Sequence, residues 1–470
     1  MSIGQQLSFF AITFLLLIFF SITGFAHSEA EIRAGFSCVD ITPPIGTPMT
    51  GFGAHFRDRS GVKGIHDPLE ARAIFLEQGT TRTLIMGMDL CFLNRKEADR
   101  MKGAIGRKLN LLPRDILLNC SHNHTGPMCS DWFYLPPAPY YMDFLEESLV
   151  KAAVEASHSL EPVSIQAGET TTKLPVNRRL PNPESGQIDF APNPQGSIYP
   201  YLPFVVFNNS AGKPLCILFS VSAHPSNIKG VDRSFYISAD YPGVAVRLLD
   251  KHIGRKGALF LQGAAGCAKC SVVPGRDKFP SGTWEEVETA GKMVADEVCA
   301  ALDGKLQPVE PSLLNCSVEL SFPLLPPLKA EDYRKVIEQP DTHAESMPEV
   351  KRVWAEDMLS CLNGGFSLST TVPMTAQGIR LGKGFRIVAI EAEIVDAHGH
   401  QIRNSYPDGI TMPLGYSNGC QMYLPTSAML PEGGYEVESY WEYHKPAPLA
   451  PGIESILADG ISHLMKEGIQ

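Results

Sequence analysis

The chain has 470 residues, 44% hydrophobic and 19% charged, a composition that excludes a peptide hormone and a disordered linker. Forty basic residues against 51 acidic ones leave a formal charge of −11, the wrong sign for a protein that neutralises phosphates, so we expect no nucleic-acid partner. The 41 glycines and 37 prolines are spread along the chain, which predicts many short strands and loops and disfavours a coiled coil or a helical solenoid.

The N-terminus has the pattern of an export signal. Residues 1–28 contain no Lys, Arg, Asp or Glu, and the apolar run 9–20 is followed by small residues. We predict a signal peptide at 1–26, cleaved after Ala26, which leaves 27–470 as a secreted or periplasmic, extracytoplasmic domain. The stretch 7–26 is also long enough for an uncleaved anchor, the competing interpretation, under which the bulk of the chain is still exported.

The further elements follow in chain order from hydrophobic periodicity. Continuous apolar runs predict strands at 73–76, 83–86, 116–118, 204–207, 216–221, 258–261 and 387–390. Helical spacing predicts helices at 96–109, 141–160, 244–253, 283–302, 330–339, 345–362 and 453–465. A Pro-rich segment, 177–195, predicts a long loop near the site. The alternation indicates an α/β fold, a mixed β-sheet with flanking helices in a single large catalytic domain.

The motif Ser-His-Asn-His-Thr-Gly-Pro at 121–127 directly follows the predicted strand 116–118. His122 and His124, at i and i+2, project to the same side of an extended backbone. They could share a metal ion, or divide into one ligand and one general acid or base. A pair of loop histidines without chemistry is the alternative.

A second histidine, His224, also lies just after a predicted strand, in Ala-His-Pro at 223–225. Strand ends are where α/β enzymes place ligands and catalytic groups, so the recurrence strengthens both candidates. The strand 258–261 runs into a small-residue turn at 262–266, where a substrate could approach backbone N–H groups. A plain tight turn is the competing interpretation of that segment.

Two further segments carry polar groups in apolar surroundings. Glu391 and Glu393 alternate with apolar residues and so face the same side of a predicted strand, where they need a partner, a metal ion or solvent. The segments Met-Tyr-Leu-Pro-Thr at 422–426 and Gly-Gly-Tyr-Glu at 433–436 form a loop rich in glycine and aromatic residues. Its phenols could bind a metal or orient an oxyanion, or they could only pack.

Taken together, the motifs have a recognisable order. They are Ala-Gly-Phe at 34–36 with Asp-Ile-Thr-Pro-Pro at 40–44, Gly-Ile-His-Asp-Pro-Leu at 64–69, the motif at 121–127, Ile-Ser-Ala-Asp-Tyr-Pro-Gly at 237–243, and Gly-Gly-Tyr-Glu at 433–436. This series resembles the neutral/alkaline, non-lysosomal ceramidase family over most of the chain after the signal peptide. The resemblance implies an exported zinc amidohydrolase that cleaves the amide of ceramide.

The resemblance also implies a set of site residues. The zinc ligands would be His122, His224, Glu393 and Tyr423, with His124 as the general acid or base that is not a ligand. These groups suit Zn²⁺ and leave room for a water whose pKa falls to roughly 7. By position alone, Tyr435 or Arg178 could stabilise the oxyanion. A lipid or N-acyl small molecule would be the substrate, with peripheral contact to a membrane; the oligomeric state stays open.

One segment departs from the family pattern. Where ceramidases have Gly-Asp-Val-Ser-Pro-Asn with a catalytic Ser, this chain reads Gly-Cys-Ala-Lys-Cys-Ser at 266–271, so that the Ser position falls on Lys269. A slip of one or two residues would bring Cys270 or Ser271 into its place, and a thiolate beside zinc and Lys269 would be reactive. A local disulfide between Cys267 and Cys270 is the equal alternative among the 11 cysteines, an odd number that leaves at least one unpaired within the chain.

The second departure is length. Full ceramidases carry a C-terminal immunoglobulin-like domain, whereas this chain ends with the predicted helix 453–465, which indicates a short form with the catalytic domain only. Two other functions therefore stay open: a zinc amidase or esterase with a non-sphingolipid substrate, and an exported zinc-binding protein without catalysis.

Overall fold

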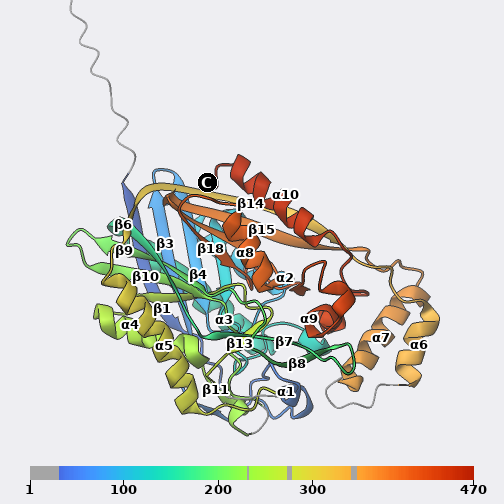
Figure 1. Ribbon diagram of the computed structural model, residues 1–470. Helices are drawn as coiled ribbons and strands as arrows, with labels where there is room; N and C mark the ends of the chain where they lie inside the picture. Colours follow the sequence, from blue (N-terminus) through green and yellow to red (C-terminus); the bar gives the residue numbers. More distant parts are fainter. Residues whose placement is uncertain (1–30, 230–231, 273–277, 340–346) are drawn as a thin grey trace, which may run out of the picture.

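The computed structural model describes residues 31–229, 232–272, 278–339 and 347–470 (Figure 1). The predicted signal peptide, 1–26, lies outside these residues. Within the described ranges, no helix combines the length and the apolarity that crossing a membrane requires.

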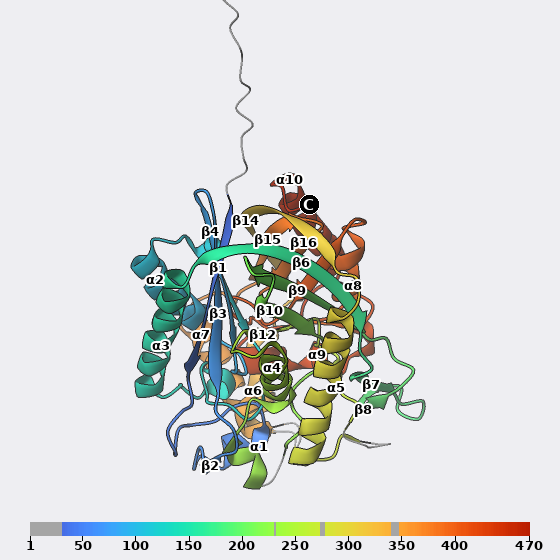
Figure 2. The ribbon, with the colours of Figure 1, turned by 90° about the vertical axis from the view of Figure 1, so that its left-hand side faces the viewer.

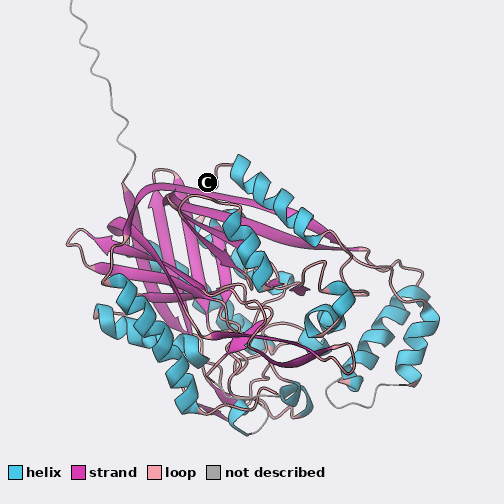
Figure 3. Ribbon diagram, viewed as in Figure 1, coloured by secondary structure: helices cyan, strands magenta, loops and turns pink. Residues whose placement is uncertain are grey.

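A mixed sheet of twelve strands organises the described residues (Figure 3). Its strands are β1 (Ile32–Asp40), β3 (Glu70–Gln78), β4 (Thr81–Met88), β5 (Ile116–Cys120), β6 (Glu161–Thr171), β9 (Tyr201–Asn209), β10 (Pro214–Val221), β12 (Ala258–Gln262), β14 (Gln307–Pro323), β15 (Thr371–Lys383), β16 (Phe385–Ile390) and β18 (Ile410–Leu414). The main order is β18-β16-β15-β14-β6-β1-β3-β4-β5, and a branch runs from β6 through β9 and β10 to β12. The pairs β4–β5, β10–β12 and β16–β18 are parallel, and the others are antiparallel.

The branching at β6 lets the sheet enclose its own core. The start of β6 pairs with β1, residues 165–167 pair with β14, and 163–171 pair with β9. In Figure 2 β6 arches across the top of the molecule and joins three arms of the sheet, which begin at β1, β9 and β14. Apolar side chains from all the arms, such as Ile85, Phe207 and Ile387, form one buried cluster between them. Strands with this cluster on one face and helices on the other are apolar throughout, as the sequence indicates.

Helices cover the outer faces of the sheet. They are α2 (Arg95–Leu109), α3 (Pro139–His158), α4 (Asp240–Ile253), α5 (Trp284–Leu302), α8 (Asp396–Asn404) and α10 (Ile453–Lys466). The helices α6 (Ala330–Glu338) and α7 (Pro348–Asn363) pack against each other to one side of the sheet (Figure 1). Figure 2 shows α2 and α3 outside the arm of β1, β3 and β4, with α4 and α5 on the other side. Capping residues fix the N-termini of two helices. The Asn94 side chain accepts from the Glu97 N–H at the start of α2, and Thr283 and Glu286 form a capping box at the start of α5.

Short elements complete the fold near the strand ends. They are α1 (Gly53–Arg57), α9 (Tyr435–Glu438), β2 (Gly64–Ile65), β7 (Pro175–Pro181), β8 (Ile188–Asn193), β11 (Tyr236–Ile237), β13 (Ala268–Cys270), β17 (Glu393–Ile394) and β19 (Tyr423–Leu424). The strands β7, β8 and β13 form a small sheet of their own, as do β17 with β19 and β2 with β11. Several of these elements carry the candidate site.

The predicted fold class, a mixed α/β sheet with flanking helices in one domain, is confirmed. Each predicted strand lies within an observed one, and each predicted helix matches an observed helix to within a few residues. The expected long loop 177–195 is wrong in form, because its turn residues close the antiparallel hairpin β7–β8. The long strands β14 and β15 escaped prediction because buried and exposed residues mix irregularly along them.

A cavity of about 350 Å³ lies between the end of β4 and α4. Asp89, just after β4, lines it, and a carboxylate oxygen of Asp89 accepts a hydrogen bond from the Glu70 N–H at 2.9 Å. Burial and then the nearby Glu70 charge raise the pKa of Asp89 to about 7. The folded chain therefore favours the protonated acid at this position.

This shift predicts a pH-dependent stability. Relative to a pKa of about 4 in the unfolded chain, the contribution of Asp89 is fully present below about pH 4 and is lost as the pH rises through about 7. We expect Asp89→Asn to lack this loss. The free energy of unfolding of the variant, measured by urea denaturation, should therefore increase relative to that of wild type as the pH rises from about 4 to about 8. The control is Asp99→Asn on the exposed face of α2. Parallel curves for Asp89→Asn and wild type would contradict the expectation.

Candidate metal centre

Side chains from four separated segments meet at one end of the sheet. His122 follows β5 and His224 follows β10, while Glu393 lies in β17 and Tyr423 in β19. Glu393 and Tyr423 are direct neighbours in the parallel pair β17–β19. The structure thus brings together all four residues that the sequence predicts as metal ligands.

The two histidines of the 121–127 motif converge by a different route from the one expected. His122 has a left-handed backbone, with φ of +66°, so the chain is not extended there. Its N–H donates to the Leu90 carbonyl at 2.8 Å, which holds the strained turn. The His122 and His124 Nε2 atoms lie 3.1 Å apart. The prediction that the two rings are close is right, and its explanation by strand alternation is wrong.

Backbone carbonyls select the tautomer of both candidate ligand histidines. The Nδ1 of His122 lies 2.9 Å from the Cys91 carbonyl oxygen, and that of His224 lies 2.8 Å from the Ala265 carbonyl oxygen. A carbonyl only accepts, so each Nδ1 must carry the proton and donate it. Burial lowers the pKa of both rings, well below the usual value for His224. Each ring is therefore neutral near pH 7, and its Nε2 presents a lone pair.

The Glu393 carboxylate completes a buried set of electron-rich atoms. Its Oε2 lies 3.4 Å from His122 Nε2 and 3.4 Å from His224 Nε2. This Oε2 is buried and has no hydrogen-bond partner among the described residues, whereas Oε1 accepts from the Tyr443 hydroxyl at 2.6 Å. Two lone pairs and a carboxylate oxygen in contact repel one another unless a cation lies between them. These residues therefore fit a bound metal ion.

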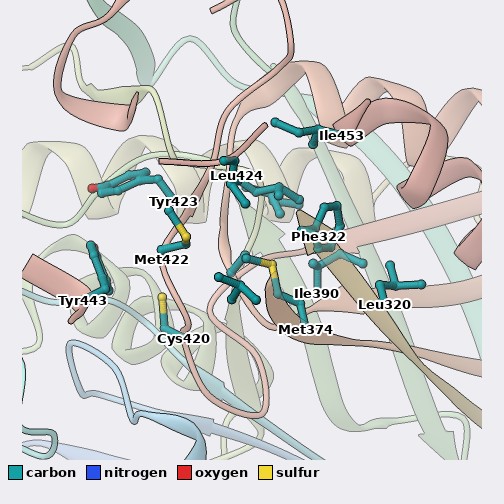
Figure 4. Close-up of a cluster of buried hydrophobic side chains, with 14 of the residues drawn as sticks. Leu320, Phe322, Met374, Ile390, Cys420, Met422, Tyr423, Leu424, Tyr443 and Ile453 are labelled. Carbon is teal, nitrogen blue, oxygen red and sulfur yellow. The ribbon is translucent and has the colours of Figure 1, made fainter. Parts of the chain in front are cut away.

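Tyr423 extends the set and is held by Arg178. The Tyr423 hydroxyl lies 3.4 Å from His224 Nε2 and accepts from Arg178 Nη2 at 2.9 Å. Figure 4 shows this hydroxyl pointing away from the hydrophobic core formed by side chains such as Leu320 and Phe322. Burial raises the pKa of the phenol, and the Arg178 charge opposes that rise. The guanidinium is thus placed to stabilise a phenolate.

Arg178 has little capacity left for a substrate oxyanion. Its Nε donates to Glu436 at 2.8 Å, and its Nη1 lies 3.2 Å from His224 Nε2. With Nη2 on Tyr423, each of its three nitrogens has a partner in the site. We therefore assign Arg178 to holding the candidate ligands instead of the oxyanion role expected from position.

Tyr435 lies at the edge of the same cluster. Its ring centroid is 5.5 Å from that of Tyr423, and its hydroxyl donates to Glu442 at 2.9 Å. Burial raises the pKa of Glu442 to about 8. The Tyr435 phenol, expected to orient an oxyanion, thus has a carboxyl partner and packs at the side of the cluster.

His124 is the partly exposed member of the group, and it belongs to an overlapping second cluster with Cys91 and His122. Its Nδ1 is buried without a partner among the described residues. Burial, followed by nearby positive charge, lowers its pKa well below the usual value, so the ring is neutral near pH 7. The Cys91 thiol faces the protonated Nδ1 of His122 at 3.7 Å, so this second cluster fits a metal less well than the set with Glu393.

Glu391 points elsewhere, and the prediction that it shares a strand face with Glu393 is wrong. Strand β16 ends at Ile390, and the chain turns before β17 begins at Glu393. The Glu391 carboxylate pairs with Arg95 at 2.5 Å and also accepts from the Thr375 N–H. Two glutamates only two residues apart therefore have different partners, one a cation and one the histidines.

The sequence would allow the Gly266 N–H to contact a substrate and the segment 266–271 to contain a disulfide, but the structure shows neither. The N–H of Gly266 donates to the Ile394 carbonyl, and a Cβ at this glycine would lie 2.9 Å from the Glu393 carbonyl oxygen. The small-residue turn therefore packs against β17 and does not offer this N–H to a substrate. Cys267 and Cys270 are both free, so the structure contains no disulfide between them.

The structure also does not bring the Cys270 thiol to the cluster. It contacts the His224 carbonyl at 3.5 Å, among apolar side chains of β10, α4 and α5. Burial raises its pKa far above the usual value, so it is not the reactive thiolate that the sequence allowed. Cys270 behaves as a small hydrophobic residue.

Three supporting residues were missed at the sequence level: Cys91, Tyr443 and Ser226. Cys91 selects the His122 tautomer through its carbonyl, a group that every residue has. Tyr443, at the end of a short 3₁₀ helix, and Ser226, in a loop, carry hydroxyls without a distinctive motif. No spacing in the sequence distinguishes them, because their roles depend on contacts across the fold.

The different partners of the two glutamates give a matched test. We expect Glu393→Gln to weaken divalent-metal affinity by more than about 100-fold, because a neutral amide replaces the carboxylate between the histidines. Glu391→Gln should retain the metal and lower the free energy of unfolding by about 1–3 kcal/mol, because Arg95 loses one of its two carboxylate partners and keeps Glu319. Metal content by mass spectrometry and urea denaturation measure the two effects. Equal metal content in both variants would contradict the assignment.

No protein-family model matches the chain, and no curated protein does. Its fold is similar to solved ceramidase structures. The neutral ceramidase from Pseudomonas aeruginosa aligns with a TM-score of 0.70 at 18% identity, over 93% of this chain and 75% of that one. A ceramidase complexed with C2 aligns with a TM-score of 0.70 at 16% identity, over 94% and 76%. The chain therefore has the fold of neutral ceramidase, and the resemblance that its motifs indicate is confirmed at the level of the fold.

Proposed function

We propose that the protein is a zinc-dependent amidohydrolase that hydrolyses the N-acyl amide of ceramide or a related lipid. The observation that carries the proposal is the unpartnered Glu393 Oε2 between two histidine Nε2 lone pairs. The fold shared with ceramidase structures supports the reaction class. Two imidazoles, a carboxylate and a phenol are ligands that suit Zn²⁺. When bound, such an ion supplies a water of lowered pKa and polarises a carbonyl oxygen.

His124 is the residue best placed to move the proton. Amide hydrolysis adds the hydroxyl of a water to the acyl carbon and a proton to the leaving amine nitrogen. His124 is neutral and partly exposed, and its Nε2 lies 3.1 Å from that of His122. It can therefore take a proton from the attacking water and return it to the amine.

Buried charges support the candidate ligands during that step. The Arg178 guanidinium contacts both Tyr423 and His224, and Glu436 balances its charge at 2.8 Å. The Tyr443 hydroxyl fixes the orientation of the Glu393 carboxylate. Because these groups are already in place, little reorganisation is needed when negative charge develops on the substrate.

Aromatic side chains pack against His122 and His124 on one flank of the cluster. On this flank Phe52 is partly exposed, whereas Phe92 and Trp132 are buried. The Phe92 ring lies 6.3 Å from that of His122 and stacks edge-on with Trp132, while the Phe52 ring lies 5.0 Å from that of His124. An exposed aromatic surface such as that of Phe52 binds hydrocarbon by excluding water. This flank supports a lipid or other N-acyl substrate, with peripheral membrane contact as part of the proposal.

Export is also proposed, on the sequence of residues 1–26. We expect the protein recovered from the periplasm or culture medium to begin at His27, as N-terminal sequencing or intact mass would show. A mature chain that retains Met1 and sediments with membranes would instead favour the uncleaved anchor.

The proposed function predicts separate effects at two neighbouring histidines. We expect His124→Ala to keep the zinc and to lower kcat for ceramide by about 10²- to 10⁴-fold, because proton transfer is lost. His122→Ala should lose both zinc and activity. The exposed His252→Ala on α4 is the control, and fatty-acid release with zinc stoichiometry is the measurement.

Two outcomes would contradict this function. A wild-type protein that binds zinc but releases no fatty acid from ceramide or from any simpler N-acyl amide would be a catalytically silent zinc-binding protein. A His124→Ala variant with full activity would remove the proton-transfer role while leaving the metal site in place.

A further inference from the structure

Lys269 is a buried lysine beside the candidate metal centre, with only 7% of its surface exposed. Its ammonium donates to the Ser226 hydroxyl at 2.5 Å and to the Ser226 carbonyl at 3.2 Å, and it lies 5.4 Å from the Phe279 ring centroid. Both oxygens are neutral, and no carboxylate among the described residues forms an ion pair with this lysine. Burial of an ammonium without a counter-charge is costly.

The strand that bears Lys269 directs it away from the apolar core. Lys269 and His224 form a parallel β-bridge, and the His224 N–H donates to the Ala268 carbonyl. Side chains alternate along a strand, and the neighbouring Cys270 packs into the apolar cluster of β10, α4 and α5. Lys269 therefore lies on the opposite face of β13, where it contacts Ser226.

The other cation near the centre is already neutralised, and Lys269 is not. Arg178 pairs with Glu436, which also pairs with Arg179. The Arg178 charge is still felt at Lys269, where burial comes first among the causes that lower the lysine pKa to about 7. The His224 side of the cluster thus contains an amine without a carboxylate partner among the described residues, while the His122 and His124 side has the aromatic flank.

These two sides differ in the group that each would bind. The aromatic flank suits an apolar acyl chain, and a buried ammonium suits an anion. An amide with its carbonyl at the cluster and its acyl chain beside Phe52 can direct its amine part toward Lys269. Ceramide itself carries only hydroxyls there, which leave the ammonium without a counter-charge.

We propose that Lys269 binds an acidic group on the amine part of the substrate, so that the preferred substrates are N-acyl amides that carry a carboxylate or sulfonate. This inference rests on the proposed hydrolase function and narrows its substrate class. Lys269 is the specificity-determining residue, and Ser226 positions its ammonium.

The experiment compares three laurates that differ only in the amine part: N-lauroylglycine, N-lauroyltaurine and the neutral N-lauroylethanolamine. We expect wild type to hydrolyse an acidic conjugate with a kcat/KM about 10- to 100-fold above that of the neutral one. A preference for N-lauroylglycine alone would indicate that the site recognises a planar carboxylate. A preference for both N-lauroylglycine and N-lauroyltaurine would indicate that it recognises either kind of anion. Equal rates on all three substrates would overturn the inference.

A variant without the lysine charge tests whether Lys269 is the source of the preference for acidic substrates. Lys269→Met should lose about 10- to 100-fold more kcat/KM on the acidic conjugates than on N-lauroylethanolamine, since only the anion loses its partner. Lys278→Met, an exposed lysine of the neighbouring segment, is the matched control. An equal loss on acidic and neutral substrates would show a merely structural role and contradict the proposal. Thermal unfolding and zinc content establish whether the variant is folded.

A binding measurement separates this inference from the proposed function. Calorimetry with N-lauroylglycine on zinc-loaded wild type and Lys269→Met needs no turnover. If no amide is hydrolysed and wild type still binds N-lauroylglycine about 10-fold or more tightly than the variant does, the hydrolase function fails and the acidic-group site stands. Equal affinities of the two proteins would overturn the site whether or not hydrolysis occurs.

Discussion

The rest of the structure depends on the mutual approach of Glu393 Oε2 and the Nε2 atoms of His122 and His224. These three atoms carry lone pairs, lie in contact and are buried from solvent. Without a positive charge between them, such an arrangement is repulsive. The fold holds it by joining each residue to a different strand end, so that no single segment can relax away from the others.

The surrounding contacts determine which atoms face the centre. The Cys91 and Ala265 carbonyls place the proton of each imidazole on the outer nitrogen, and the Tyr443 hydroxyl occupies the outer carboxylate oxygen. Such outer contacts orient metal ligands and raise their basicity. The strained backbone of His122 also serves to orient a candidate ligand, because it directs the ring toward the centre. The hydrogen bond to the Leu90 carbonyl helps to offset the conformational cost.

The charges around the centre are unevenly balanced, and this connects the fold to substrate choice. Arg178 has its carboxylate partner, whereas Lys269 has only the neutral oxygens of Ser226 among the described residues. Lys269 occupies the segment at which the sequence departs from the ceramidase pattern. A shared fold therefore does not by itself imply a shared substrate, because substrate recognition depends on the individual side chains that line a site.

The sequence by itself determined the fold class, and the resemblance of its motifs to ceramidases implied the four residues that meet at the centre. Apolar runs and helical spacing locate most elements because burial on both faces requires continuous apolarity, and the order of the motifs indicates the ceramidase resemblance. Local pattern could not place β14 and β15, whose half-buried faces lack a clear period, or the hairpin in 177–195. Only the tertiary structure decided the different partners of Glu391 and Glu393, the orientation of Cys270 away from the cluster and the isolation of Lys269. These depend on which distant side chains lie within a few ångströms, and neither composition nor spacing encodes such contacts.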